Sequence, residues 1–414
     1  MFSSAWFYSA LLILFLAAVL REPALAAVAI LLLLTAGLTW LWNHFCLSRV
    51  SYERVFSELR VFPGEQVTLT VRVANRKILP LAWLETVDEF PARLPLIKGK
   101  VMQSANPLVA SLSHAVSLRW YERIGWRYEF VAAARGYYPF GPVNVRSGDP
   151  FGFFETDEKL PNVDHLIVYP RVVELENLGL PSKQPFGDVK SRERIFEDVS
   201  RFVGIRDWQQ GDERRRIHWK ATARRQGLQV RVYEPTSTLN VAIFLNVATL
   251  PEIWEGSDPE LLEAAITAAA SLANFALESR CPTGLYANTS VPCSDQPIRI
   301  PPGRSPAQLT TILEALAKVT AFPIVPLEDL LNAECGRLPW GVTLVIVSAI
   351  LPESLLATLV RLRDAGHRLT LATIGVDAPA EALSGINGIN VLRVTERKQD
   401  RPAPVPWGAT ARQA

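Results

Sequence analysis

Two apolar stretches at the N-terminus constrain the fold of this chain most strongly. Residues 1–20 contain no charged side chain, and residues 24–42 contain none either. A helix rises 1.5 Å per residue, so about 20 apolar residues cover the roughly 30 Å hydrocarbon thickness of a bilayer. Only three residues separate the two stretches. We therefore expect residues 1–45 to form a transmembrane helical hairpin.

A secretory signal peptide is the alternative for the first stretch, because residues 24–26 (Ala-Leu-Ala) resemble a cleavage site. No Lys or Arg precedes the stretch and a second one follows at once, which favours the hairpin. Arg49, Arg54 and Arg60 follow the second stretch, and cationic flanks of this kind stay in the cytoplasm. We therefore expect both termini and the soluble domains to be cytoplasmic.

The remaining composition excludes several classes of function. The four cysteines form no C-x-x-C pair, which is typical of a reducing compartment. The five histidines form no H-E-x-x-H motif, so we expect no metal site. The formal net charge is only +2, which does not favour nucleic acid as a partner.

Alternating apolar and polar residues indicate β-strands in residues 51–170. Val67, Leu69, Val71 and Val73 alternate with polar residues, the pattern of a strand with one buried face. Further strand-like stretches, separated by Pro or Gly turns, occupy residues 81–87, 116–121, 127–132 and 143–145. We expect a small antiparallel β-sandwich here.

Two motifs rich in Gly, Pro and aromatic residues follow in the same region. They occupy residues 135–142 and 148–154. Gly supplies positive φ and Pro fixes φ, so we expect both motifs to be tight turns with the aromatic rings packed at the corner.

Positive charge is concentrated in a segment at residues 185–235. From Lys190 to Arg231 there are twelve Lys or Arg and six Asp or Glu. Asp212 is a candidate N-cap for a helix with Arg224 and Arg225 in its last turn and Gly227 at its end.

This basic segment is the candidate binding site. Trp208 and Trp219 stand among its cations, and an indole is costly to leave in water unless it packs or meets a partner. An acidic protein surface, anionic lipid head groups and a phosphate are all possible ligands. The residues predicted to bind a partner are Arg206, Asp212, Arg214, Arg216, Trp219, Lys220, Arg224 and Arg231.

Strands and helices alternate in residues 238–395, which predicts a doubly wound parallel sheet. Asp258 before Pro259 is a candidate cap for one helix, and residues 305–308 are a candidate capping box for the next. Ligands of such sheets bind at the carboxyl ends of the strands. The strand at 239–247 is followed by Ala248 and the strand at 343–347 by Ser348, so neither ends in a carboxylate. We expect no cofactor and no enzymatic activity. The alternative is an enzyme with a site between domains that uses Asp212 or His218 as acid or base.

Three motifs in order resemble a bacterial family catalogued as a domain of unknown function, number fifty-eight. They are Arg135-Gly136-Tyr137 with Gly141-Pro142, then residues 149–152 (Asp-Pro-Phe-Gly), then the basic segment from Arg206 to Arg231. The resemblance implies a protein of the bacterial plasma (inner) membrane. It also implies a von Willebrand factor A-like C-terminal domain and a MoxR-type AAA+ ATPase as partner.

The sequence departs from the pattern of the family at one place. Many relatives carry Asp-x-Ser after the first strand of the α/β domain, as part of a metal-ion-dependent adhesion site. Asn246 and Ala248 stand there in this sequence, and Ala349 stands where an acidic residue is common. Mg²⁺ prefers carboxylate ligands, so we expect this site to be degenerate. Residues 396–414 are polar and Pro-rich, and we expect a disordered tail.

Overall fold

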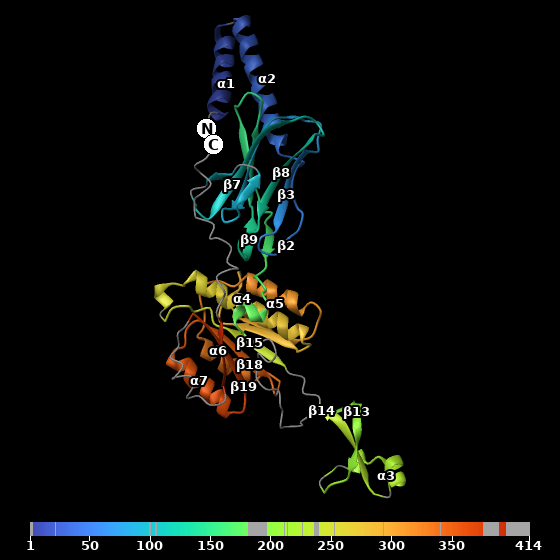
Figure 1. Cartoon of the computed structure of the whole chain (residues 1–414). Coiled ribbons are helices and arrows are strands. Elements are labelled where there is room, and N and C mark those ends of the chain that lie inside the picture. Colours follow the sequence, from blue (N-terminus) through green and yellow to red (C-terminus); the bar gives the residue numbers. More distant parts are fainter. Residues whose placement is uncertain are drawn as a thin grey trace. The chain divides into compact units, whose positions relative to one another are not determined.

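The computed structural model divides into two compact units, Met1–Arg171 and Val172–Pro402 (Figure 1). The residues that it describes are 3–20, 22–98, 101–103, 106–180, 197–210, 212, 214–225, 227–235, 240–251, 253–292, 294–339, 341–375 and 389–394. The predicted tail at 396–414 and the first part of the predicted basic segment, 185–196, lie outside these residues.

The first unit begins with two helices, α1 (Ser3–Leu20) and α2 (Pro23–Cys46), which pack against each other (Figure 1). Pro23 occupies the first turn of α2, where its missing N–H costs no hydrogen bond. Helix α2 is long and apolar enough to span a bilayer, and only 11% of its most apolar window is buried within the protein. Helix α4 (Pro259–Glu278), which belongs to the second unit, is also long and apolar enough to span a bilayer, but 61% of its most apolar window is buried within the protein.

Most of the first unit is built from three β-sheets. The first contains, in order, β1 (Val50–Phe56), β3 (Gln66–Asn75), β8 (Arg123–Val131) and β5 (Leu96–Lys98). The second contains β11 (Glu155–Leu160), β10 (Val143–Gly148), β4 (Leu81–Pro91), β7 (Val109–Leu118) and β6 (Met102–Gln103). The third contains β2 (Arg60–Val61), β12 (Asp164–Val168) and β9 (Gly136–Phe140). All pairings are antiparallel except that of β2 with β12.

The inward residues of these strands form one hydrophobic core. Leu69 from β3, Leu84 from β4 and Phe140 from β9 are fully buried in it. The ring of Phe90 packs edge-on against both Phe130, at 5.6 Å between centroids, and Phe140, at 5.3 Å. Cys46 at the end of α2 belongs to the same cluster, so the last turn of α2 is anchored in the sandwich core.

The structure corrects two predictions in this region. The strand expected at 116–121 runs instead over Val109–Leu118, because it pairs along the whole of β4. The motif at 135–142 was expected to be a turn, but Gly136–Phe140 forms β9 and pairs with β12. Only Gly141, with φ 97°, and Pro142 turn the chain there.

The second unit contains a six-stranded sheet with five parallel strands and one antiparallel edge strand, β17. Its order is β17 (Ile298–Gly303), β16 (Thr283–Ala287), β15 (Val241–Leu245), β18 (Thr343–Ser348), β19 (Arg368–Ile374) and β20 (Ile389–Val394). Helices α6 (Leu327–Cys335) and α7 (Glu353–Asp364) pack on the face that carries Ala242 and Phe244. Helix α4 packs on β15, β16 and β18 and on α5 (Gln308–Ala317).

The N-termini of α4 and α5 show which of the two predicted helix caps the structure confirms. Asp258 was predicted to cap α4, and its Oδ1 accepts the N–H of Glu260 at 2.8 Å. The predicted capping box at 305–308 is wrong, because α5 has Ala307 at its N-cap with no side-chain hydrogen bond. The Gln308 side chain instead donates to the carbonyls of Thr283 and Pro301, which ties the helix to the sheet.

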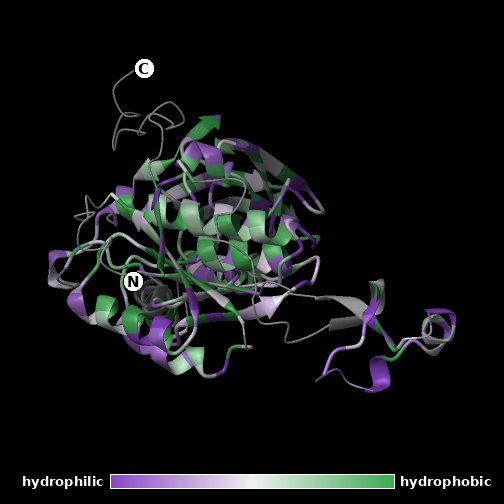
Figure 2. Cartoon of the chain, turned by 60° about the horizontal axis from the view of Figure 1, so that its bottom comes forward, coloured by the Kyte–Doolittle hydropathy of each residue, from purple (hydrophilic) through white to green (hydrophobic). Residues whose placement is uncertain are grey.

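The second unit also contains a two-stranded antiparallel hairpin, β13 (Glu197–Asp207) and β14 (Gln229–Pro235). Between the strands lie a 3₁₀ turn, η2 (Arg214–Arg216), and a short helix, α3 (Trp219–Arg225). Figure 2 shows hydrophilic residues around this end of the hairpin.

Candidate functional site

The end of the hairpin, residues 204–231, is called the basic tip below. Its frame is held by hydrogen bonds between the turn and β14. The N–H of His218 donates to the Gln229 carbonyl at 2.8 Å, and the N–H of Gln229 donates to Thr222 Oγ1 at 3.0 Å. Ile217 bridges to Val230, and both side chains are buried. The tip is therefore a folded element with a small core of its own.

An ion pair across the turn replaces the predicted helix cap. Arg206 donates from both Nη atoms to the two carboxylate oxygens of Asp212, at 2.7 and 2.6 Å. Asp212 Oδ2 also accepts the N–H of Gln209 at 2.8 Å. The prediction of one helix beginning at Asp212 is therefore wrong, because this carboxylate closes a loop with β13.

Helix α3 begins only at Trp219, six residues later than expected. His218 Nδ1 accepts the N–H of Ala221 at 3.1 Å and so caps the first turn. The hydrogen bonds from Arg206 and from the Gln209 backbone lower the pKa of Asp212. A carboxylate with a lowered pKa is a poor general acid, and this ring nitrogen of His218 is already engaged.

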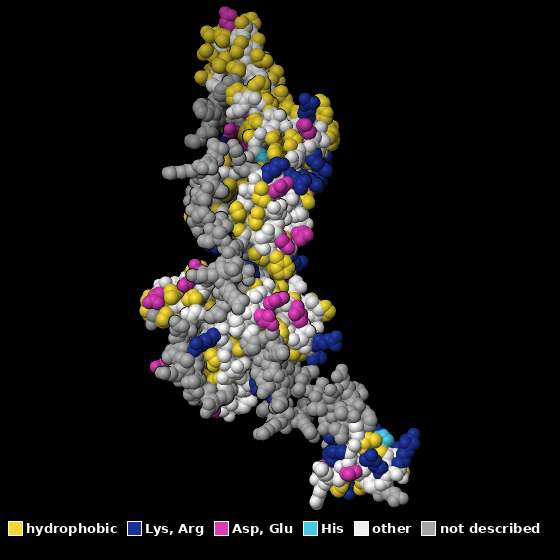
Figure 3. Space-filling model, viewed as in Figure 1, with side chains coloured by type: hydrophobic (Ala, Val, Ile, Leu, Met, Phe, Trp, Pro, Cys, Tyr) yellow, Lys and Arg dark blue, Asp and Glu magenta, His cyan; other side chains and the backbone are white. Residues whose placement is uncertain are grey.

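Six cations of the basic tip are exposed, and none is in an ion pair with another described residue. They are Arg214, Arg215, Lys220, Arg224, Arg225 and Arg231. The Trp219 side chain is 68% exposed among them. Figure 3 shows Lys and Arg side chains, in dark blue, gathered on the basic tip. The surface thus offers positive charge and a large aromatic ring together.

The eight predicted site residues fall into two groups. Arg206 and Asp212 form the frame, and Arg216 lies close enough to help lower the pKa of Asp212. The other five residues have side chains that are exposed at the surface, and they are Arg214, Trp219, Lys220, Arg224 and Arg231.

The carboxyl end of the α/β sheet is closed by a buried polar network. Asn246, which follows β15, donates from Nδ2 to Ser348 Oγ at 2.9 Å. Asn246 Oδ1 accepts from Asn288 Nδ2 at 2.9 Å and from the N–H of Ala248 at 3.1 Å. Ser348 Oγ in turn donates to the Ile350 carbonyl at 2.6 Å. The side chains at the three strand ends therefore satisfy one another.

This network does not fit a divalent metal ion. Mg²⁺ needs oxygen ligands, usually with a carboxylate among them, and the amide oxygen of Asn246 already accepts two hydrogen bonds. Among the described residues, no three His, Cys, Asp or Glu side chains are placed to hold a metal.

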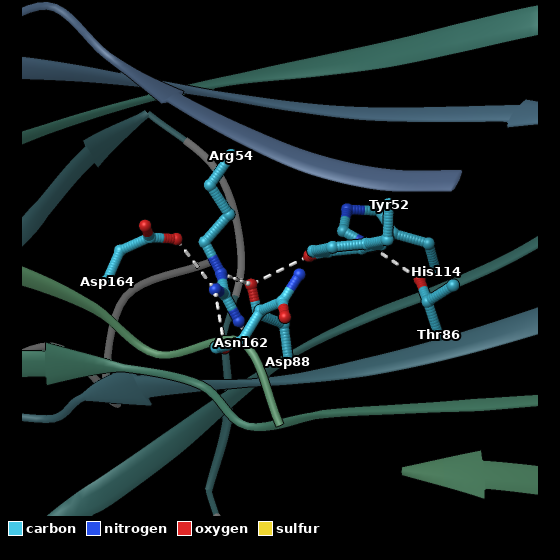
Figure 4. A network of polar contacts seen from close by, with 7 residues as sticks. All are labelled: Tyr52, Arg54, Thr86, Asp88, His114, Asn162 and Asp164. Carbon is cyan, nitrogen blue, oxygen red and sulfur yellow. Dashed lines mark hydrogen bonds and ion pairs between the residues drawn. The ribbon is translucent and has the colours of Figure 1, made fainter. Parts of the chain in front are cut away.

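A third cluster, inside the sandwich, was not predicted from the sequence (Figure 4). Arg54 on β1 donates from Nε and Nη2 to Asp88 on β4, at 2.8 and 2.7 Å, and both side chains are buried. Tyr52 donates its hydroxyl to the same carboxylate at 2.7 Å. Arg54 Nη1 also donates to Asp164 and to the Asn162 carbonyl, so this guanidinium connects β1 to β4 and to the start of β12.

His114 on β7 extends the buried polar residues of the sandwich. Its Nδ1 lies 3.3 Å from Thr86 Oγ1, and its Nε2 is hydrogen-bonded to the Tyr128 hydroxyl. Burial lowers the pKa of His114 and raises the pKa of Tyr128. Burial and the bond to Asp88 likewise raise the pKa of Tyr52. These groups cross the space between the two large sheets, which indicates a role in fixing how the sheets pack.

The two glycine motifs serve these structural contacts. A Cβ at Gly141 would collide with the Arg54 guanidinium and lie 2.6 Å from the Asn162 carbonyl oxygen, so only glycine leaves room for the arginine. In the second motif, Asp149 accepts the N–H groups of Phe151 and Phe154 and holds the turn between β10 and β11.

Comparison with known proteins gives a family match for most of the second unit. Residues 204–392 match the family model described as "Protein of unknown function DUF58". The "Uncharacterized protein YeaD" of Bacillus subtilis is 25% identical over 194 residues, which are 47% of this chain and 46% of that protein. The chain thus matches about half the length of this curated relative. The family resemblance stated above is confirmed for residues 204–392.

Likeness to solved structures is weak. One chain of a type I cohesin–dockerin complex from Clostridium thermocellum matches with a TM-score of 0.21 and 12% identity, covering 28% of this chain and 99% of that one. The sporulation control protein Spo0M of Bacillus subtilis matches with a TM-score of 0.16 and 14% identity, covering 30% and 50%. Scores of this size support no statement about a shared fold or function.

Proposed function

We propose that this protein is a membrane-anchored adaptor whose basic tip binds an acidic protein surface. The observation that carries the proposal is the group of six exposed cations around the exposed indole of Trp219, which form no ion pair with the residues that the structure describes. Aromatic and arginine side chains dominate the binding energy of protein interfaces, and charge complementarity speeds encounter with the partner. A separate frame, based on Arg206 and Asp212, holds these side chains in place without engaging them.

The anchor is the pair of helices α1 and α2, inserted as a hairpin in the bacterial plasma membrane. Helix α2 has the length and composition of a membrane span and buries little of its surface in the protein. Arg49, Arg54 and Arg60 follow it, which favours a cytoplasmic position for the soluble domains. The partner implied by the family resemblance is a MoxR-type AAA+ ATPase, and the α/β domain is von Willebrand factor A-like on the same ground.

A pull-down from detergent-solubilised cells tests the adaptor role. The test variant carries Arg214→Glu and Arg224→Glu, both at exposed positions outside the frame. The control carries Arg304→Glu and Arg368→Glu, which make the same change of charge at exposed positions of the α/β domain. We expect the test variant to lose most of the partner protein that the wild type and the control recover.

Two outcomes would count against the proposal. Equal recovery by the test variant would remove the basic tip from the binding surface. Equal loss by the control would mean that overall charge, and not this surface, governs the association. Circular dichroism of each purified variant establishes that the fold is retained.

A further inference from the structure

One end of the sandwich carries exposed hydrophobic side chains on three loops. Ile78 is 74% exposed, Trp120 64%, Tyr121 66% and Phe151 67%. They lie after β3, between β7 and β8, and between β10 and β11. The strand registers place these loops together, because Leu81 pairs with Leu118 and Ser147 pairs with Leu84. We call these four side chains, three aromatic and one aliphatic, the aromatic rim.

The end of α2 is fixed to this same end of the sandwich. Lys77, next to Ile78, donates from Nζ to the carbonyls of Phe45 and Ser48, at 2.7 and 2.8 Å, and also to that of Cys46. Burial lowers the pKa of Lys77 to about 8, so the ammonium is still charged at neutral pH. Its bonds satisfy carbonyls that the end of a helix leaves without partners.

Further contacts make the junction stiff. Cys46 is buried in the sandwich core, and Trp42 packs against that core. The N–H of Tyr121 donates to the Lys77 carbonyl at 3.3 Å, and Asn75 Nδ2 donates to the carbonyls of both Leu79 and Arg119 at 2.9 Å. The loops that carry Ile78, Trp120 and Tyr121, the Lys77 side chain and the last turn of α2 are thus one connected structure.

The composition of this end matches the head-group region of a bilayer. Trp and Tyr prefer the boundary between lipid and water, and arginines near the surface are attracted to anionic lipids. The exposed Arg119 and Arg123 flank Trp120 and Tyr121 along the chain, and the exposed Arg49 accepts the N–H of Arg76, next to Lys77, at its carbonyl at 3.0 Å. On the face drawn in Figure 3, hydrophobic and cationic side chains gather where the helices meet the sandwich.

The loop between β7 and β8 contains a residue with an unusual backbone conformation. Tyr121 has φ 55°, a left-handed conformation that non-glycine residues rarely adopt. Glycine would fit this turn with less strain, yet the position carries an exposed aromatic ring. The side chain is therefore expected to have a use outside the fold of the sandwich.

We propose that the aromatic rim inserts into the head-group layer of the leaflet from which α2 emerges, with Arg49, Arg119 and Arg123 on lipid phosphates. The sandwich then contacts the membrane surface directly and is not connected to it only by a flexible linker. This inference rests on the proposed insertion of α2.

Spin labels on the full-length protein in nanodiscs of phosphatidylethanolamine and phosphatidylglycerol test it. Cys281 and Cys293 are first replaced by serine, while Cys46 and Cys335 are buried and shielded from the label. Labels are placed singly through Ile78→Cys, Trp120→Cys, Tyr121→Cys and Phe151→Cys. Collision with a water-soluble nickel chelate and with membrane-soluble oxygen is then measured by electron paramagnetic resonance.

Two matched positions calibrate the result. Leu108→Cys lies at an exposed position beside Val109, which pairs with Pro91 at the opposite end of the sandwich. Leu38→Cys lies at an exposed position of α2, about 12 Å along the helix from Cys46 and so within the hydrocarbon.

We expect the rim labels to collide with nickel several-fold less often than the Leu108 label, and to collide with oxygen more often. Rim labels that behave as the Leu108 label does, while the Leu38 label reports hydrocarbon, would overturn the rim but leave the anchor in place. A Leu38 label that reports water would overturn the anchor and the rim together.

Discussion

Two Arg–Asp pairs in this protein have almost the same geometry and opposite surroundings. Arg54 and Asp88 meet at 2.7 Å between the sheets of the sandwich, with both side chains 1% exposed. Arg206 and Asp212 meet at 2.6 Å on the basic tip, with side chains 40% and 15% exposed. The first pair holds a core together, and the second shapes a surface. Distance alone therefore says little about what an ion pair does.

The difference follows from the solvent around each pair. A buried charge whose partner is removed has no water to replace it, whereas an exposed one is solvated again at once. The buried pair is also supplemented by Tyr52 and Asp164, while the exposed pair lies among six cations that form no ion pair with any described residue. The sandwich thus uses the charges of this pair inside its core, and the basic tip presents its cations at the surface.

Loss of the buried pair is the largest effect that we expect. Arg54→Leu leaves Asp88 as an unpaired buried carboxylate, and this should lower the free energy of unfolding by about 3 to 5 kcal/mol. Arg76→Leu is the matched control, because its pair with Glu53 is exposed and should contribute ~0 to 1 kcal/mol. Urea unfolding followed by tryptophan fluorescence measures both. Similar values for the two variants would show that the buried network does not hold the sheets together.

Acid should destabilise the sandwich through His114. Burial holds its pKa below 6.5 in the folded protein, so below that pH the unfolded chain binds a proton that the folded chain does not. Stability is then complete above pH 6.5 and falls as the pH decreases, by up to about 1.4 kcal/mol per pH unit. His114→Gln should flatten this part of the curve of unfolding free energy against pH. An unchanged slope would assign the acid sensitivity to other groups.

The exposed pair should give the smallest effect on stability. Arg206→Gln removes the bidentate bond to Asp212, but water replaces it, so the melting temperature should not change measurably. Hydrogen exchange should nevertheless become faster at Gln209, whose N–H donates to the same carboxylate. A large fall in melting temperature would mean that the basic tip contributes to the stability of the whole unit.

Local patterns in the sequence predicted much of the fold. The absence of charge in residues 1–20 and 24–42 indicated the two helices, and period-two alternation in residues 67–73 indicated β3. The cap at Asp258 was also found, because it depends on neighbours two and three residues away. These signals hold when the groups that interact are close along the chain.

The features that were missed depend on partners distant in sequence. Arg54 and Asp88 are 34 residues apart, and Asn246 and Ser348 are 102 apart. One signal was present: Arg54 shares the inward phase of β1 with Tyr52, which is unusual for a cation. The helix predicted from Asp212 failed for a different reason, because Arg206 on β13, only six residues away, binds the carboxylate that was expected to cap it.

The central claim is that the basic tip is a protein-binding surface. Its most direct test is a photoreactive phenylalanine analogue at Trp219, activated in intact cells and followed by mass spectrometry. We predict an adduct with a protein that has an acidic surface, and we predict that this adduct disappears when Arg214→Glu and Arg224→Glu are added. An adduct with lipid, or a protein adduct that is unaffected by these two substitutions, would contradict it.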